Sequence, residues 1–167
     1  MFELKPLSKD AIAGALAKAE RYRLLNEAEE AESICLDVLA VDPANQQAVS
    51  MLILSITDQF RDDVSGNVAR AQALLPALAD DYSRAYFAGI IHERRAKAGL
   101  HHRGLEPRLG MYECMMAAMR EFERAAAIRP AGNDDAILRW NACARTLMRY
   151  PSLRPEVEDQ PQAIMSE

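Results

Sequence analysis

Apolar residues recur at helical spacing in nearly every segment of this 167-residue chain. In residues 8–25, for example, Ala15, Ala19 and Tyr22 fall three or four positions apart, which places them on one face of a helix. No segment alternates apolar and polar residues in the way that a half-buried strand does. This period predicts an all-α protein.

Prolines, glycines and polar turns divide the pattern into seven predicted helices. Pro43 and Pro130 end the second and sixth helices, and Pro76 predicts a kink or an early end in the fourth. Ser8 and Asn45 are the expected N-caps of the first and third helices. The expected helices are 8–25, 27–41, 45–59, 67–79, 83–97, about 106–128 and about 134–150, with turns at 60–66 and 99–110.

The length predicts one helical domain over residues 1–150, followed by a proline-containing, acidic and mobile tail over 151–167. No apolar run reaches the roughly 18 residues of a membrane span, and the N-terminal residues lack the pattern of a secretory signal. The cysteines Cys35, Cys114 and Cys143 lie in helical patterns without a CxxC pair. We therefore expect buried thiols and a cytoplasmic protein with no membrane partner.

Charge is distributed unevenly along the chain, which carries 20 Lys and Arg, 25 Asp and Glu and a net charge of −5. Residues 27–63 contain nine acids and the single base Arg61, whereas bases outnumber acids in 89–108. The net acidity argues against a nucleic-acid partner. The uneven distribution predicts two solvated faces of opposite sign, and the alternative is a polarised binding surface.

Two segments have the spacing of a repeated unit. In the first, Ala19, Tyr22 and Ala31 precede Pro43, and this spacing resembles the tetratricopeptide repeat, a helix–turn–helix unit of about 34 residues. Cys35 stands where the family usually has a large aromatic residue, and Ala15 replaces the usual tryptophan.

The second match precedes Pro130, with Ala118, Phe122 and Ala125 at the small, aromatic and small sites and Gly89 as the close-contact residue of the preceding helix. The two matches lie further apart than whole repeats allow, so we expect insertions at 60–66 and 99–110. The middle unit matches poorly, and Ala69 or Ala73 is its expected small residue.

The resemblance implies a right-handed superhelix of about three helix pairs. The predicted helix at 134–150 would cap the last pair, with Trp140 and Leu147 facing inward and polar residues facing water.

Members of this family are usually non-catalytic adaptors or scaffolds that bind a segment of another protein in a concave groove, so the resemblance implies that role here. The family's groove positions correspond to Leu16, Glu20, Arg23, Gln47, Ser50, Leu54, Tyr86, Ile90, Glu93 and Arg94. This mixture of apolar and charged residues suits an extended or helical peptide. The Lys and Asn pattern with which some members clamp a C-terminal carboxylate is absent. The alternatives are a secretion or assembly chaperone for one client and a homodimer whose groove is filled by its twin or by the tail.

Other residue clusters favour structural roles. His92 is separated from His101 and His102 by a predicted helix end, and the three lack the four-ligand array of structural zinc. Met111, Met115 and Met119 share one stripe of a helix, which predicts core packing, with a partner surface as the alternative. Motifs for nucleophilic, metal-dependent or nucleotide chemistry are absent. We therefore expect no enzymatic activity, no metal and no cofactor.

Overall fold

The computed structural model describes residues 2–61, 63–99 and 105–154, and it describes side chains of the last range from residue 110 onward. These residues form seven α-helices and no strand, which confirms the all-α prediction. The helices are α1 (Ile12–Leu24), α2 (Ala28–Val41), α3 (Gln46–Asp58), α4 (Val64–Leu74), α5 (Asp81–Gly99), α6 (Leu105–Ala127) and α7 (Asp135–Arg149).

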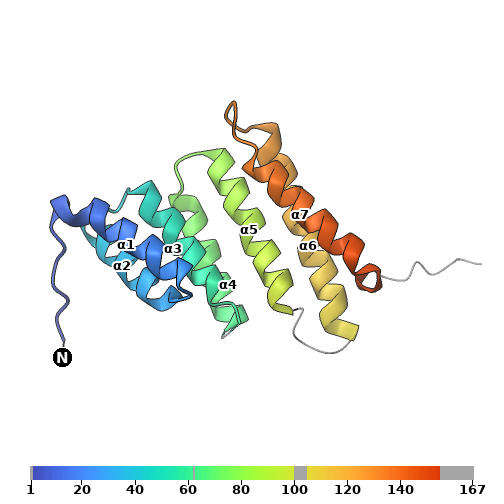
Figure 1. Ribbon diagram of the computed structural model, residues 1–167, viewed down its shortest axis with the longest axis horizontal. Helices are drawn as coiled ribbons and strands as arrows, with labels where there is room; N and C mark the ends of the chain where they lie inside the picture. Colours follow the sequence, from blue (N-terminus) through green and yellow to red (C-terminus); the bar gives the residue numbers. More distant parts are fainter. Residues whose placement is uncertain (1, 62, 100–104, 155–167) are drawn as a thin grey trace, which may run out of the picture.

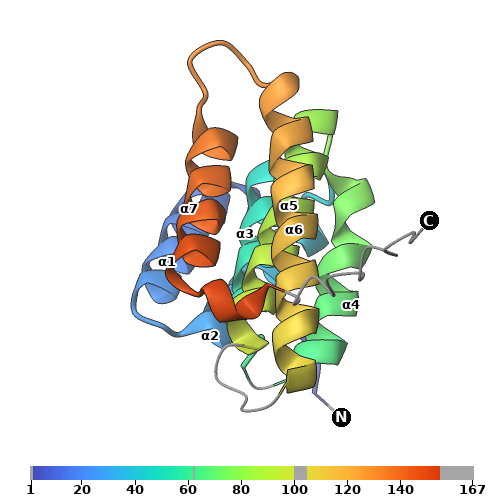
Figure 2. The same cartoon turned by 90° about the vertical axis from the view of Figure 1, so that its right-hand side faces the viewer.

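The helices follow one another side by side from α1 at one end of the molecule to α7 at the other (Figure 1). Each helix packs against the next one in the chain, and α3 also contacts α1 and α5. In the view turned by 90°, α1 and α7 lie on one side of the molecule and α4 lies on the opposite side (Figure 2). None of the described helices offers the length and apolarity that a bilayer span demands.

The start of α4 differs from its predicted position. Asp63 is the N-cap, and its Oδ1 accepts a hydrogen bond of 3.0 Å from the backbone N–H of Gly66, so the helix begins at Val64. A Cβ at Gly66 would lie 2.2 Å from Asp63 Oδ2, so a larger residue at this position would displace the capping carboxylate. The predicted turn at 60–66 is therefore wrong at its C-terminal end, because Gly66 was taken as a helix breaker. The predicted early end at Pro76 is confirmed, since α4 ends at Leu74 and a 3₁₀ turn, Leu75–Ala77, follows.

The two predicted N-caps have different outcomes. Asn45 Oδ1 accepts a hydrogen bond of 2.9 Å from the backbone N–H of Ala48, as expected at the start of α3. Ser8 makes no side-chain capping hydrogen bond, and the 3₁₀ turn Lys9–Ala11 precedes α1 instead. Ser8 therefore holds the N-cap position of this 3₁₀ turn, not of α1 itself, and its side chain makes no capping bond.

The first hydrophobic core lies among α1 to α5, and α3 supplies most of its large side chains, including Leu52, Ile53 and Ile56. Ala19 and Ala31 are fully buried where α1 meets α2, as predicted for close-contact positions. Ala71 is the fully buried alanine of α4, whereas Ala69 and Ala73 are exposed. The expected small residue of the middle unit was therefore wrong by two positions.

The second core lies among α5, α6 and α7, and its tightest contact joins Gly89 to Phe122. A Cβ at Gly89 would lie 2.5 Å from Phe122 Cε1, so only glycine lets α5 and α6 approach this closely. Met111 and Met115 are buried and Met119 packs against the same core, which confirms the core role of the methionine stripe.

The helix α7 packs onto this second core through Leu147 and the half-buried Trp140, as predicted. Its outer face is not wholly polar, because Leu138 and Met148 are exposed. The 3₁₀ turn Pro151–Leu153 buries Leu153 against the same core, so the packed chain continues past residue 150. Residues 155–167 of the predicted tail lie outside the described residues.

Candidate functional site

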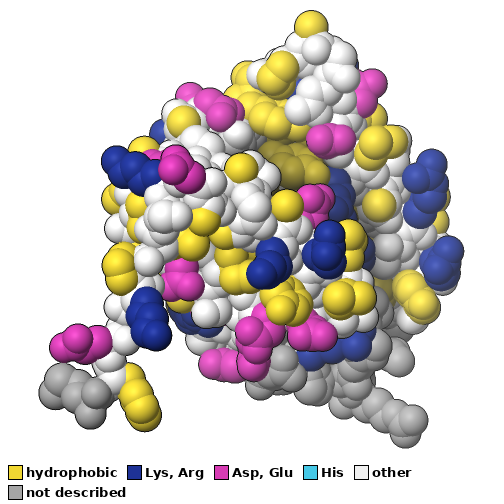
Figure 3. Space-filling view, turned by 60° about the vertical axis from the view of Figure 1, so that its left-hand side comes forward, with side chains coloured by type: hydrophobic (Ala, Val, Ile, Leu, Met, Phe, Trp, Pro, Cys, Tyr) yellow, Lys and Arg dark blue, Asp and Glu magenta, His cyan; other side chains and the backbone are white. Residues whose placement is uncertain are grey.

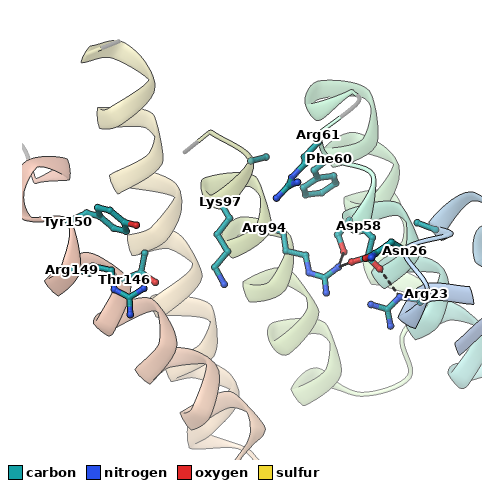
Figure 4. A pocket seen from close by; sticks show the side chains of 13 residues that line it. Arg23, Asn26, Asp58, Phe60, Arg61, Arg94, Lys97, Thr146, Arg149 and Tyr150 are labelled. Atoms are coloured by element: carbon teal, nitrogen blue, oxygen red, sulfur yellow. Dashed lines mark hydrogen bonds and ion pairs between the residues drawn. The ribbon is translucent and has the colours of Figure 1, made fainter. Parts of the chain in front are cut away.

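A cleft of about 780 Å³ crosses the C-terminal ends of α1, α3, α5 and α7 (Figure 4). Each of these alternate helices contributes side chains, although the contributing segments lie far apart in the sequence. The charged residues that line it within the described chain are Arg23, Asp58, Arg61, Arg94, Lys97 and Arg149. We call this feature the basic cleft, because five of these six side chains are cationic in a chain whose net charge is −5.

Asp58 joins the first three of these helices at one side of the cleft. Its Oδ2 accepts a hydrogen bond of 2.8 Å from Arg23 Nε of α1, and its Oδ1 accepts one from Arg94 of α5. Arg94 also donates to Thr57 Oγ1 at 2.7 Å and to the carbonyl of Leu54 at 3.1 Å. Burial lowers the pKa of Arg94 and Asp58 opposes that shift, but a guanidinium stays protonated in proteins. Figure 4 shows the two ion pairs side by side.

Glu93 organises the other side, between α5 and α7. Its side chain is fully buried, its Oε1 accepts a hydrogen bond from Lys97, and its Oε2 lies 3.5 Å from a terminal nitrogen of Arg139. Oε2 accepts no hydrogen bond from the described residues. A buried carboxylate without cations is costly, so Glu93 holds Lys97, which lines the cleft, and Arg139 close to it.

Helix ends account for part of the positive charge. The C-terminus of a helix carries about half a negative charge, which attracts cations in its last turn. Arg23, Lys97 and Arg149 occupy the last turns of α1, α5 and α7. Arg61 follows the end of α3 and Arg94 lies in the interior of α5, so helix ends do not explain these two cations.

An acidic pocket of about 310 Å³ adjoins the basic cleft and shares Asn26, Ala28 and Asp58 with it. Glu27, Glu29 and Glu30, around the start of α2, provide its other charges. The surface therefore changes sign over a short distance at this edge of the cleft. On the face shown in Figure 3, acidic and basic side chains are interspersed around a hollow with a hydrophobic floor.

The structure brings together only two of the predicted groove residues in this cleft, Arg23 and Arg94. Glu20 and Gln47 are exposed on helix surfaces outside it. Ser50, Leu54 and Tyr86 are half-buried, and the last two pack against the second core.

Three predicted groove residues are not accessible to a partner, which corrects the expected groove surface. Leu16 packs into a small core with Val38 and Ala48, and Ile90 belongs to the second core. Glu93 is buried beneath Lys97 and Arg139. In each case a neighbouring helix covers a position that faces solvent in the family pattern.

Sequence reasoning missed Asp58, Arg61, Lys97 and Arg149. All four lie at or near helix C-termini, and Arg149 belongs to a helix that we expected to serve only as a cap. The available signal was the repeated occurrence of Arg and Lys within a few residues of the C-terminal ends of alternate helices. These cations form one site only because the folded chain places the helix ends side by side.

A second cavity of about 660 Å³ lies between α5 and α6 and is lined by His92, Arg95 and Cys114, among others. Burial lowers the pKa of His92 and raises that of Cys114, so both shifts favour neutral side chains over a thiolate–imidazolium pair. Burial also raises the pKa of Cys35 and Cys143 to about 12, as expected for core thiols. The described residues contain no group of three or more potential ligands placed to hold a metal ion, and His101 and His102 lie outside them.

The sequence matches no protein-family model, and the searches of curated proteins and of solved structures gave no match.

Proposed function

We propose that this chain is a non-catalytic protein-interaction module that binds a segment of another protein in the basic cleft. The observation that carries this proposal is the construction of the cleft from the C-terminal ends of four alternate helices. Such a surface is long, open and lined by side chains with hydrogen-bonding capacity, which suits a peptide segment more than a compact small molecule.

The packing supports a tetratricopeptide-like arrangement in which α1/α2, α3/α4 and α5/α6 form the pairs and α7 caps the last one. Consecutive helices pack together, and α3 contacts its alternate neighbours α1 and α5. Small residues stand at the expected helix contacts: Ala19 and Ala31 are buried between α1 and α2, and Gly89 faces the Phe122 ring between α5 and α6. In this arrangement α1, α3, α5 and α7 would line the binding face.

Affinity capture from a lysate of the native cell, with the full chain as bait, tests the proposal. The informative variant is the charge reversal Arg61→Glu/Arg149→Glu, because both side chains are exposed and line the cleft. The matched control is Arg21→Glu/Arg145→Glu, which makes the same charge change at exposed positions outside it. Circular dichroism and thermal melts establish that both variants fold.

We expect the wild type and the control variant to recover the same partner protein, and we expect the cleft variant to lose it. Equal recovery by both variants would place the binding surface elsewhere. Recovery of the bait alone would instead favour self-association, which the molecular mass in solution would then show.

A further inference from the structure

The cationic character of the basic cleft points to the chemistry of its ligand. Within the described chain, five cations and one carboxylate line the cleft, while the chain as a whole is acidic. We infer that the bound segment is a short acidic stretch of another protein, whose Asp and Glu carboxylates contact Arg61, Lys97 and Arg149. This inference rests on the proposed function and adds the class of ligand to it.

The cations of the basic cleft differ in whether they already pair with a carboxylate. Asp58 is shared between Arg23 and Arg94, and Lys97 is paired with the buried Glu93. Arg61 and Arg149 are exposed, and neither lies within ion-pair distance of a carboxylate of the described residues. A free guanidinium presents parallel N–H donors that match the two oxygens of a carboxylate. These two arginines, one from each side of the cleft, are therefore the principal contacts.

The surroundings of the cleft select among anionic ligands. The acidic pocket beside it, with Glu27, Glu29 and Glu30, repels negative charge that extends beyond the cleft in that direction. A nucleic acid carries its charge uniformly along the chain, so it is repelled wherever it continues over this region. A peptide can concentrate its carboxylates in the cleft and present neutral or basic residues to the acidic pocket, so a protein segment fits better.

Fluorescence anisotropy with the full chain tests the inference directly. The probe is a fluorescein-labelled peptide of about twelve residues with four Glu among Ala, Gly and Ser, and its control carries Gln in place of Glu. At low ionic strength we expect the Glu peptide to bind at least about tenfold more tightly than the Gln peptide, and the difference to shrink as added salt screens the charges.

The same variants connect the effect to the cleft. Arg61→Glu/Arg149→Glu should weaken binding of the Glu peptide at least about tenfold, whereas Arg21→Glu/Arg145→Glu should change it by no more than about twofold. Arg21 occupies the last turn of α1, so its reversal also controls for the loss of a cation at a helix end. Equal affinity for the Glu and Gln peptides would overturn the inference.

Two further experiments test whether a nucleic acid or the chain's own C-terminal segment occupies the cleft instead. A single-stranded oligonucleotide of about twelve bases that displaced the Glu peptide at equal concentration would favour nucleic acid and overturn the inference. The chain's own C-terminal segment contains Glu156, Glu158 and Asp159. If the variant Glu156→Gln/Glu158→Gln/Asp159→Asn bound the Glu peptide about tenfold more tightly, the occupant would be this segment, not a partner.

The outcomes for the two proposals are separable. Capture of a protein that depends on Arg61 and Arg149, combined with equal binding of the Glu and Gln peptides, would retain the proposed function and reject the acidic ligand. Binding of the Glu peptide that ignored the reversal of both arginines would reject the acidic ligand of the cleft, while equal capture of a protein by both variants would reject the proposed function.

Discussion

The two sides of the basic cleft are organised by carboxylates in opposite surroundings. The Asp58 side chain is 28% exposed and bridges Arg23 and Arg94, whereas the Glu93 side chain is fully buried and holds Lys97 and Arg139. An exposed ion pair can exchange its partner for solvent or a ligand at little cost, but a buried one cannot. The Asp58 carboxylate is therefore partly open to solvent, while the Glu93 carboxylate is closed off from it.

The two hydrophobic cores also differ in composition. The first core interlocks many branched aliphatic side chains from α3, including Val49, Leu52 and Ile53. The second relies on one close contact, Gly89 with Phe122, surrounded by flexible methionines. We therefore expect stability in the second core to depend strongly on the contact between Gly89 and Phe122.

The largest expected effect is that of Phe122→Ala. The fully buried ring fills the space above Gly89, so its removal should cost about 3–5 kcal/mol of unfolding free energy, measured by urea denaturation. Phe60→Ala is the matched change in the first core. A loss at Phe122 well below that at Phe60 would contradict the concentration of stability at the α5–α6 contact.

The carboxylates come next. Glu93→Gln should cost about 1.5–3 kcal/mol, because a charged hydrogen-bond acceptor is lost from a buried site. Asp58→Asn should cost less, about 1 kcal/mol, because this carboxylate is partly exposed and Arg94 keeps its hydrogen bonds to Thr57 and the Leu54 carbonyl. Thermal melts of both variants, side by side, test the contrast, and equal losses would remove the distinction between the two carboxylates.

A pair of glycines gives the third test. Gly89→Ala should destabilise the protein by about 1–3 kcal/mol, because the added methyl group meets the Phe122 ring. Gly14→Ala, in α1, meets no atom within 4 Å and should stabilise it by about 0.5–1 kcal/mol. Chemical denaturation of the two variants should therefore give shifts of opposite sign, and stabilisation by both would show that α5 and α6 move apart at little cost.

The smallest expected effects concern helix starts. Asn45→Ala removes a side-chain cap from α3 and should cost about 1 kcal/mol. Asp134→Ala, at the start of α7, removes an exposed pair with Arg129 but no cap and should cost less than about 0.5 kcal/mol. Urea midpoints resolve this difference, and a larger loss at Asp134 would reverse the assigned roles.

The helices could be predicted from the sequence because their signal is local. Apolar spacing and the breakers Pro43, Pro76 and Pro130 marked most boundaries, and buried small residues such as Ala19 and Gly89 marked close contacts. The start of α4 was missed because the Asp63 cap outweighs the low helix propensity of Gly66.

The site could not be predicted to the same degree, because it depends on how separate helices are placed relative to one another. Family offsets assigned Leu16 and Ile90 to an exposed groove, but neighbouring helices bury both. Arg23 and Arg94 were found individually, yet nothing local indicated that Asp58 would join them. Arg149 was missed because α7 was treated only as a cap, although it forms one wall of the cleft.

The cleft reaches from α1 to α7, and this span has a consequence for cooperativity. In a row of helices that contact mainly their neighbours, the two ends can fray independently. A ligand that contacted Arg23 and Arg149 together would join the first helix to the seventh and close the row into a ring of contacts. Neither end could then open without releasing the ligand, so occupancy would turn fraying into a single, all-or-none transition.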